Sequence, residues 1–153
     1  MGKIEQKLAD LKLELPETPK ANGLYEIYRI ETGVVYTSGQ LSRVGEDVIS
    51  GCLAEGDELD LAWKAARICV LRCLAVVKAA VGDLDKVDRI ISVRGFVSSH
   101  PGFTVHSKVL DPASQLLLDL FGKAGRHVRT AVGVSSLPSG GLVEMELSVR
   151  LRS

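Results

Sequence analysis

Residues 142–151, Leu-Val-Glu-Met-Glu-Leu-Ser-Val-Arg-Leu, alternate apolar and polar side chains along nearly their whole length. Because successive side chains of a β-strand point to opposite faces, this run predicts a strand with one buried face and one polar face. The buried face needs a covering layer, and residues 61–81 and 107–121 are long runs of helical character. The sequence therefore predicts an α+β domain in which two long helices cover one face of a sheet.

Shorter patterns supply the other elements. They predict a short amphipathic helix at residues 3–12, strands at 25–31, 34–38, 87–97 and 127–134, and a long loop at 41–57. Asp60 is expected to cap the first long helix and Gly82 to end it, and Gly95 suggests a bulge in its strand. This order predicts a two-layer mixed sheet in a single domain over residues 1–153, with residues 1–20 as an N-terminal helical extension.

Composition limits the classes of protein to consider. Nineteen basic residues balance nineteen acidic ones, so no charge surplus attracts a polyanion, and nucleic acid is disfavoured as a partner. No apolar run reaches the roughly 18 residues of a spanning helix, and the polar N-terminus does not resemble a signal peptide. The expected protein is soluble and cytoplasmic, with no membrane partner.

The cysteine pattern predicts neither disulfides nor a metal site. Cys69 and Cys73 lie in an apolar helical run and Cys52 in a loop-like stretch. Three cysteines do not make a disulfide framework, and the three histidines do not lie at zinc-ligand spacing from them. Buried, unreactive thiols are the favoured interpretation, and no metal or cofactor is expected.

Three places carry side chains suited to chemistry. Arg129 lies inside a strand, where its guanidinium could capture a carboxylate or form a surface or intersubunit salt bridge. Glu144, on the polar face of the last strand, could position water or move a proton, although such faces are usually solvated. The segment Thr37–Gln40 ends a strand with hydroxyls, a glycine and an amide, which also fits an ordinary turn. His127 would share the face of Arg129 and is more typical of a packed interface residue than of a proton donor.

Several blocks occur together in a fixed order. They are Gly23-Leu24-Tyr25, Tyr36-Thr37-Ser38-Gly39-Gln40, residues 82–87, residues 129–134, Leu137-Pro138 and residues 143–146. In this order and spacing, from about Gly23 onward, the chain resembles the RidA (YjgF, endoribonuclease L-PSP-like) family. The resemblance implies a chorismate mutase-like fold, a homotrimer whose sheets line a central barrel, and ligand sites in the clefts between subunits.

The resemblance also implies a reaction, the hydrolysis of reactive 2-imino acids or enamines to 2-keto acids and ammonia, without a cofactor. Arg129 would hold the substrate carboxylate, and Glu144 would position water or move protons. The implied substrate-binding residues are Tyr25, which would close the cleft, and Ser38, Gly39 and Ala131. Ala131 stands where many deaminating members carry a cysteine, which indicates a different subgroup and widens the range of possible ligands.

Two other functions stay open. A trimer could bind a small carboxylate without turnover, and an endoribonuclease activity comes third because the charge is balanced and paired histidines are absent. If residues 137–141 form a hairpin turn, Arg129 and Glu144 share a face about four residues apart, roughly 13 Å at the strand rise. That separation favours a cleft completed by another chain.

Overall fold

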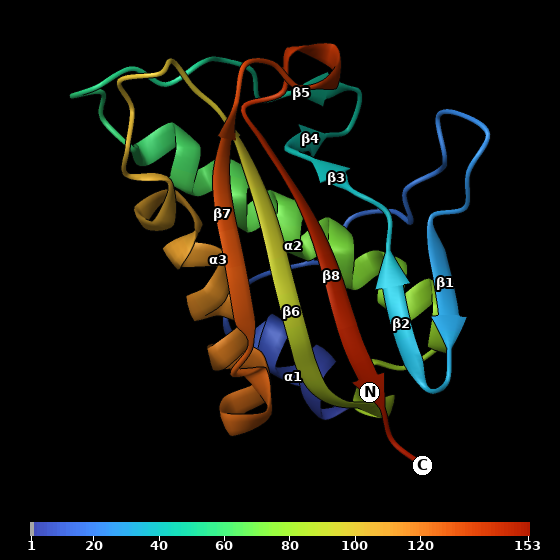
Figure 1. The fold of residues 1–153 in the computed structure, drawn as a ribbon. Coiled ribbons are helices and arrows are strands. Elements are labelled where there is room, and N and C mark those ends of the chain that lie inside the picture. Colours follow the sequence, from blue (N-terminus) through green and yellow to red (C-terminus); the bar gives the residue numbers. More distant parts are fainter. Residues whose placement is uncertain (1) are drawn as a thin grey trace.

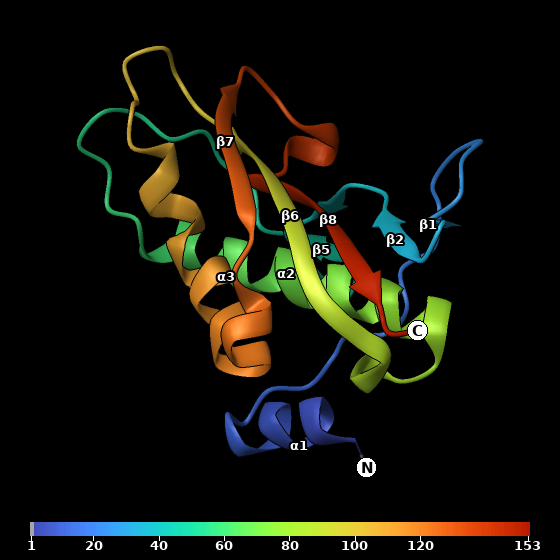
Figure 2. The same ribbon diagram turned by 60° about the horizontal axis from the view of Figure 1, so that its bottom comes forward.

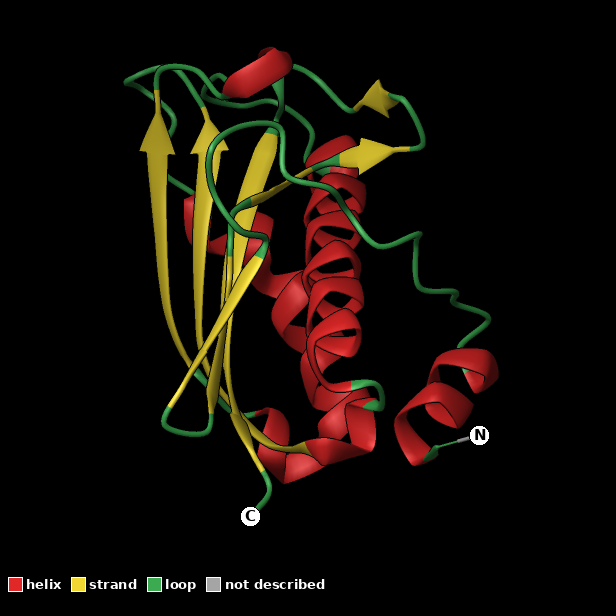
Figure 3. Cartoon of the chain, turned by 90° about the vertical axis from the view of Figure 1, so that its right-hand side faces the viewer, coloured by secondary structure: helices red, strands yellow, loops and turns green. Residues whose placement is uncertain are grey.

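Strand β8 (Val143–Leu151) lies at the centre of the sheet, with a neighbouring strand on each side. In the computed structural model, which describes residues 2–153, its predicted alternation is confirmed. Every second side chain from Val143 to Val149 is buried beneath the helices, and the intervening ones, beginning with Glu144, are half-buried on the open face. The side view in Figure 3 shows the two layers, sheet and helices.

The strands form a mixed sheet, as predicted. Its order is β1 (Tyr28–Glu31), β2 (Val34–Thr37), β8, β6 (Val87–Ser98) and β7 (Val128–Val134), shown across Figure 1. Strand β7 pairs in parallel with β6 at the edge, and the other neighbours are antiparallel. Residues 41–57 are not only loop, because β3 (Gln40–Leu41) pairs with β8, and β4 (Arg43–Val44) pairs with β5 (Asp47–Val48). A strand of two residues is too short to show the alternation of apolar and polar side chains from which strands are predicted.

Helices α2 (Asp60–Val81) and α3 (His106–Phe121) cover one face of the sheet, and α1 (Lys3–Asp10) lies outside them (Figure 2). Gly82 ends α2 with a φ of 86°, a conformation that favours glycine. The predicted cap is wrong, because Asp60 is the first helical residue and Leu59 holds the cap position without a side-chain bond. None of the described helices is long and apolar enough to cross a membrane.

Two thiols join α2 to the central strand. Cys69 Sγ lies 3.3 Å from the carbonyl oxygen of Val143, and Cys73 Sγ lies 3.4 Å from that of Met145. Both cysteines are fully buried, and burial raises both pKa values, that of Cys73 to about 12. These thiols are therefore protonated packing groups, as expected, while Cys52 is exposed. No cluster of metal-binding side chains occurs among residues 2–153.

Helix α3 packs closely against β6 because of Gly95. A Cβ there would lie 2.1 Å from Leu110 Cδ1, so only glycine leaves room for the helix. The predicted bulge at Gly95 is wrong: this residue pairs regularly with Ala131 and Met145, and the irregularities lie nearer the start of β6. Close approach of a helix explains the glycine.

The Asp85 carboxylate binds the beginning of the N-terminal helix. The backbone N–H groups of Lys3 and Ile4 donate to the Asp85 carboxylate over 2.8 and 3.0 Å, and these bonds lower the pKa of Asp85. Ile4 and Leu8 are buried against the rest of the core. The predicted helical extension is therefore an ordered part of the fold.

Candidate functional site

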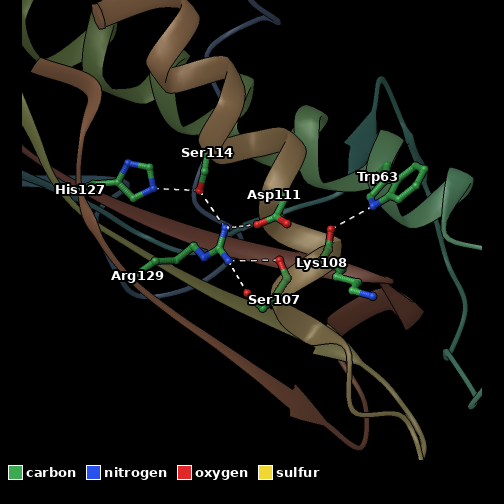
Figure 4. A network of polar contacts seen from close by, with 7 residues as sticks. All are labelled: Trp63, Ser107, Lys108, Asp111, Ser114, His127 and Arg129. Carbon is green, nitrogen blue, oxygen red and sulfur yellow. Dashed lines mark hydrogen bonds and ion pairs between the residues drawn. The ribbon is translucent and has the colours of Figure 1, made fainter. Parts of the chain in front are cut away.

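Arg129 points from β7 to helix α3 (Figure 4). Its Nη1 donates to Asp111 Oδ1 and Ser114 Oγ, both over 3.0 Å. Its Nη2 donates to the carbonyl oxygen of Ser107 over 3.2 Å and to the hydroxyl of the same residue over 2.6 Å. The Arg129 side chain is 18% exposed, whereas that of Asp111 is 66% exposed. The guanidinium thus already holds one carboxylate, supplied by its own chain.

His127 belongs to the same network, and it lies on the face of Arg129 as predicted. Its Nδ1 is 2.7 Å from the carbonyl oxygen of Gly125, and its Nε2 is 2.9 Å from Ser114 Oγ. Because a carbonyl oxygen only accepts, Nδ1 carries a proton, and in the corresponding neutral tautomer Nε2 accepts from the Ser114 hydroxyl. Ser114 therefore donates to His127 and accepts from Arg129.

Pro112 explains why the beginning of α3 offers a carbonyl to a side chain. Proline has no N–H, so the carbonyl oxygen of Lys108, four residues earlier, lacks its usual helical donor. The indole Nε1 of Trp63 donates to that oxygen over 3.0 Å (Figure 4). Trp63, Lys108, Asp111 and Pro112 line a shallow cavity of about 420 Å³ beside the network. Neither the hydrogen bond of the indole nor the cavity could be inferred from the sequence.

Glu144 forms a second group, on the open face of the sheet. A Cβ at Gly39 would lie 2.7 Å from Glu144 Oε1, so the carboxyl group rests against backbone that only glycine leaves uncovered. Burial, and then the charge of Glu146, raise the pKa of Glu144 above its usual value. A carboxyl group with a raised pKa is better suited to accept and return a proton near neutral pH.

The segment beside Glu144 is held by side-chain bonds. Thr37 Oγ1 accepts from the backbone N–H of Leu147 over 3.0 Å, which joins the segment to β8. Gln40 is buried, and its Nε2 donates to Ser38 Oγ over 3.1 Å. Arg72 Nη2 donates to Gln40 Oε1 over 3.2 Å. Ser38 and Gly39 are therefore placed next to Glu144 by a small polar network.

The remaining predicted site residues lie apart from Glu144. Ala131 is half-buried on β7 and packs against the core on the face that carries Arg129. Tyr25 is 51% exposed before β1, and its hydroxyl accepts from the backbone N–H of Asn22 over 3.3 Å. One chain thus gathers Ser38 and Gly39 with Glu144, Ala131 with Arg129, and leaves Tyr25 outside both groups.

The predicted face shared by Arg129 and Glu144 is wrong. Strand β6 lies between β7 and β8, so residues 137–141 do not close a hairpin. Arg129 is level with Val93, which is buried under the helices, whereas Glu144 is level with Phe96 on the other side. The two charged groups therefore lie on opposite faces of the sheet. A turn predicted from the sequence does not show which strand of the sheet will pair with the strand that follows the turn.

Comparisons with known proteins agree with this fold. Residues 5–150 match the family model described as "YjgF/chorismate mutase-like, putative endoribonuclease". Protein TCP17 of Trypanosoma cruzi is 36% identical over 157 residues, covering 99% of this chain and 96% of that protein.

Solved structures show the same likeness. Atu1372 of Agrobacterium tumefaciens, a protein of unknown function, has a TM-score of 0.88 and 37% identity, covering 98% of this chain and 94% of its own. A Shewanella oneidensis MR-1 protein, described as a "putative endoribonuclease", has a TM-score of 0.92 and 32% identity, covering 98% of this chain and 100% of its own. E. coli TdcF, solved with bound serine, shares the fold at a TM-score of 0.61 and 21% identity, covering 90% and 94%. The chain belongs to the YjgF/chorismate mutase-like family, the family of RidA and L-PSP proteins.

Proposed function

We propose that this protein hydrolyses small 2-imino acids or their enamines to 2-keto acids and ammonia, in a site that two subunits of a homotrimer complete. The observation that carries the proposal is the position of Glu144, a half-buried carboxyl group of raised pKa against the backbone of Gly39. Ser38 and the backbone of Gly39 offer polar groups beside it. A small electrophile bound there would meet a proton carrier of suitable pKa.

The reaction needs one proton relay. The imine reacts in its protonated form. Glu144, as the carboxylate, takes a proton from water while the water oxygen bonds to the imine carbon, which gives a neutral carbinolamine. The carbinolamine receives the proton of Glu144 on its nitrogen. The C–N bond then breaks with its electron pair going to nitrogen, the hydroxyl oxygen passes its proton to the Glu144 carboxylate to form the keto group, ammonia leaves, and Glu144 returns that proton to solvent. Positioning the imine and this one acid–base group suffice, because an imine is already electrophilic.

The carboxylate of the substrate needs a separate anchor. Arg129 and Glu144 lie on opposite faces of one subunit, so Arg129 would serve a site whose Glu144 comes from a neighbour. Arg129 would exchange Asp111 for the substrate carboxylate, since both ligands offer the same group. Because the Asp111 side chain is exposed, its ion pair with Arg129 contributes little free energy, and little is lost when the substrate replaces it.

The test uses an imino acid generated in the assay by an amino-acid oxidase, with keto-acid release as the readout. Glu144→Gln is expected to lower kcat/KM by about 10²- to 10⁴-fold, the usual contribution of a proton-transfer group. Glu146→Gln, two residues along the same face, is the matched control and should keep its maximal rate. Because the charge of Glu146 raises the pKa of Glu144, its removal should shift the pH profile to lower pH. Wild-type protein with no acceleration over buffer would overturn the proposal.

A second candidate is a non-catalytic trimer that binds small carboxylates. The observation in its favour is the Arg129 network, in which the guanidinium already binds the carboxylate of Asp111 and is oriented by two further acceptors, Ser114 Oγ and the carbonyl oxygen of Ser107. Thermal shift with keto acids separates the two functions, because binding stabilises the native state with or without turnover. Stabilisation by a keto acid without imine hydrolysis would select the binding function.

A further inference from the structure

A groove of about 900 Å³ lies apart from Arg129 and Glu144. It is bounded by residues 16–22, by the β4–β5 ribbon and by one side of α2. Three basic side chains, Lys20, Arg43 and Arg72, line it together with two acidic ones, Glu17 and Glu46. Of these residues only Arg72 touches the proposed reaction site, through its bond to Gln40, and the others have no part in it.

Arg72 is incompletely satisfied where it lines this groove. Its Nη2 donates to Gln40, but its Nε is buried and has no hydrogen-bond partner among the described residues. A buried donor without an acceptor is destabilising, and more so when the group is charged. Arg43 donates from Nη1 to the carbonyl oxygen of Glu46 over 3.2 Å and likewise meets no carboxylate within 4.0 Å in the described chain.

The two arginines also repel each other. Burial, and then the charge of Arg43, lower the pKa of the Arg72 guanidinium from its usual value. Other arginines of the described fold do pair with carboxylates: Arg129 with Asp111, and Arg94 with Glu146. Two neighbouring guanidinium groups without a carboxylate are stabilised when an anion lies between them.

We propose that this groove binds a small metabolite through an oxyanion, either a phosphate or a carboxylate, held between Arg43 and Arg72. The planar donor groups of arginine match both oxyanions, and a small rotation of Arg72 would give its Nε–H an acceptor. Lys20 adds a positive charge at the same groove. Glu17 and Glu46 can accept hydrogen bonds from hydroxyl or amino groups on the rest of the ligand, which disfavours ligands with additional negative charge.

The test is calorimetric titration of the full chain with inorganic phosphate and, separately, with lactate, a hydroxylated monocarboxylate, at an ionic strength kept constant with sodium chloride. One of the two anions is expected to bind, and to bind at least tenfold more weakly to Arg43→Gln and to Arg72→Gln. Arg67→Gln, an exposed position on the same helix, is the control and should bind like the wild type. The preferred anion identifies the source of the oxyanion.

Two results would overturn the proposal. One is the absence of binding by either anion at millimolar concentration, and the other is equal affinity in the wild type and in Arg43→Gln. Arg43 is on a short surface ribbon, so its variant keeps the test valid if Arg72→Gln fails to fold. The test is independent of imine hydrolysis, because Arg129→Ala and Glu144→Gln should leave affinity at this groove unchanged.

Discussion

Arg129 shows how a residue predicted from its type can have an unpredicted partner. A long cation inside a strand implies an anion, and the sequence offers nineteen acidic residues from which to supply it. Only the structure pairs it with Asp111, eighteen residues away on a helix that lies over the strand. Two serines and a backbone carbonyl of that helix complete the set of acceptors. The donor groups of Arg129 therefore suit a carboxylate, and they already bind the carboxylate of Asp111.

Asp111→Asn tests this internal competition. Removing the charge should strengthen binding of small keto acids by about 1.4-fold to fivefold, which corresponds to the usual 0.2–1 kcal/mol of an exposed ion pair. Asp119→Asn, on the same helix and paired only with Gln115, is the control. Isothermal titration with pyruvate gives the measurement. Weaker binding by Asp111→Asn would show that Asp111 supports the geometry of Arg129 rather than competing for it.

The raised pKa of Glu144 predicts a change of stability with pH. A carboxyl group whose pKa is higher in the folded state binds its proton more tightly there, so its contribution is full below the unfolded pKa of about 4.3 and is lost as pH rises through the folded value. Relative to wild type, Glu144→Gln should therefore gain stability as the pH rises above about 4. Urea unfolding at several pH values measures this, with the exposed Glu31→Gln as control. A difference independent of pH would contradict the assignment.

Helices and strands could be predicted from the sequence where their apolar pattern repeats over many residues. The two long helices and the strand β8 follow from repeated apolar spacing, and glycine ends α2 as expected. The order of the strands in the sheet could not be predicted from the sequence. Nothing in residues 135–142 shows that the chain leaves β7, crosses over β6 and forms β8 on the other side of β6. That single choice of neighbour places Arg129 and Glu144 on opposite faces. The site residues could thus be named from the sequence, but their arrangement depends on pairings between distant segments.

Helix α3 offers a test at the scale of one element. Pro112→Ala would restore an N–H that competes with Trp63 for the carbonyl oxygen of Lys108. We expect the unfolding free energy to rise by less than the roughly 3 kcal/mol of a proline inside a helix, because the wild-type carbonyl is already satisfied. Trp63 is the only tryptophan, so its emission should shift to the red as the indole turns to water. Unchanged emission would show that the indole contact does not depend on the proline.

The proposal of a trimer rests on the open face of the sheet, the face that the helices do not cover. Tyr36, Val128 and Val132 are 47%, 69% and 40% exposed. Ladder pairing puts Tyr36 and Val128 at one level of this face and Val132 with Glu144 at another. Exposed β-branched and aromatic side chains on adjoining strands favour association with a second surface. A subunit interface there would also remove water from around Glu144 and bring a neighbour to it.

Light scattering of the purified protein tests the assembly, and a trimer would have three times the 16.4 kDa mass of the chain. Val132→Glu puts an unpaired charge into the proposed interface and should yield monomers, because a buried charge without a partner is strongly unfavourable. Val44→Glu, 52% exposed on the separate β4–β5 ribbon, should remain trimeric. If sites form between subunits, Val132→Glu should also lose imine hydrolysis while keeping a native circular dichroism spectrum. A monomeric wild type, or a monomeric variant with full activity, would place the site within one chain and contradict the shared cleft.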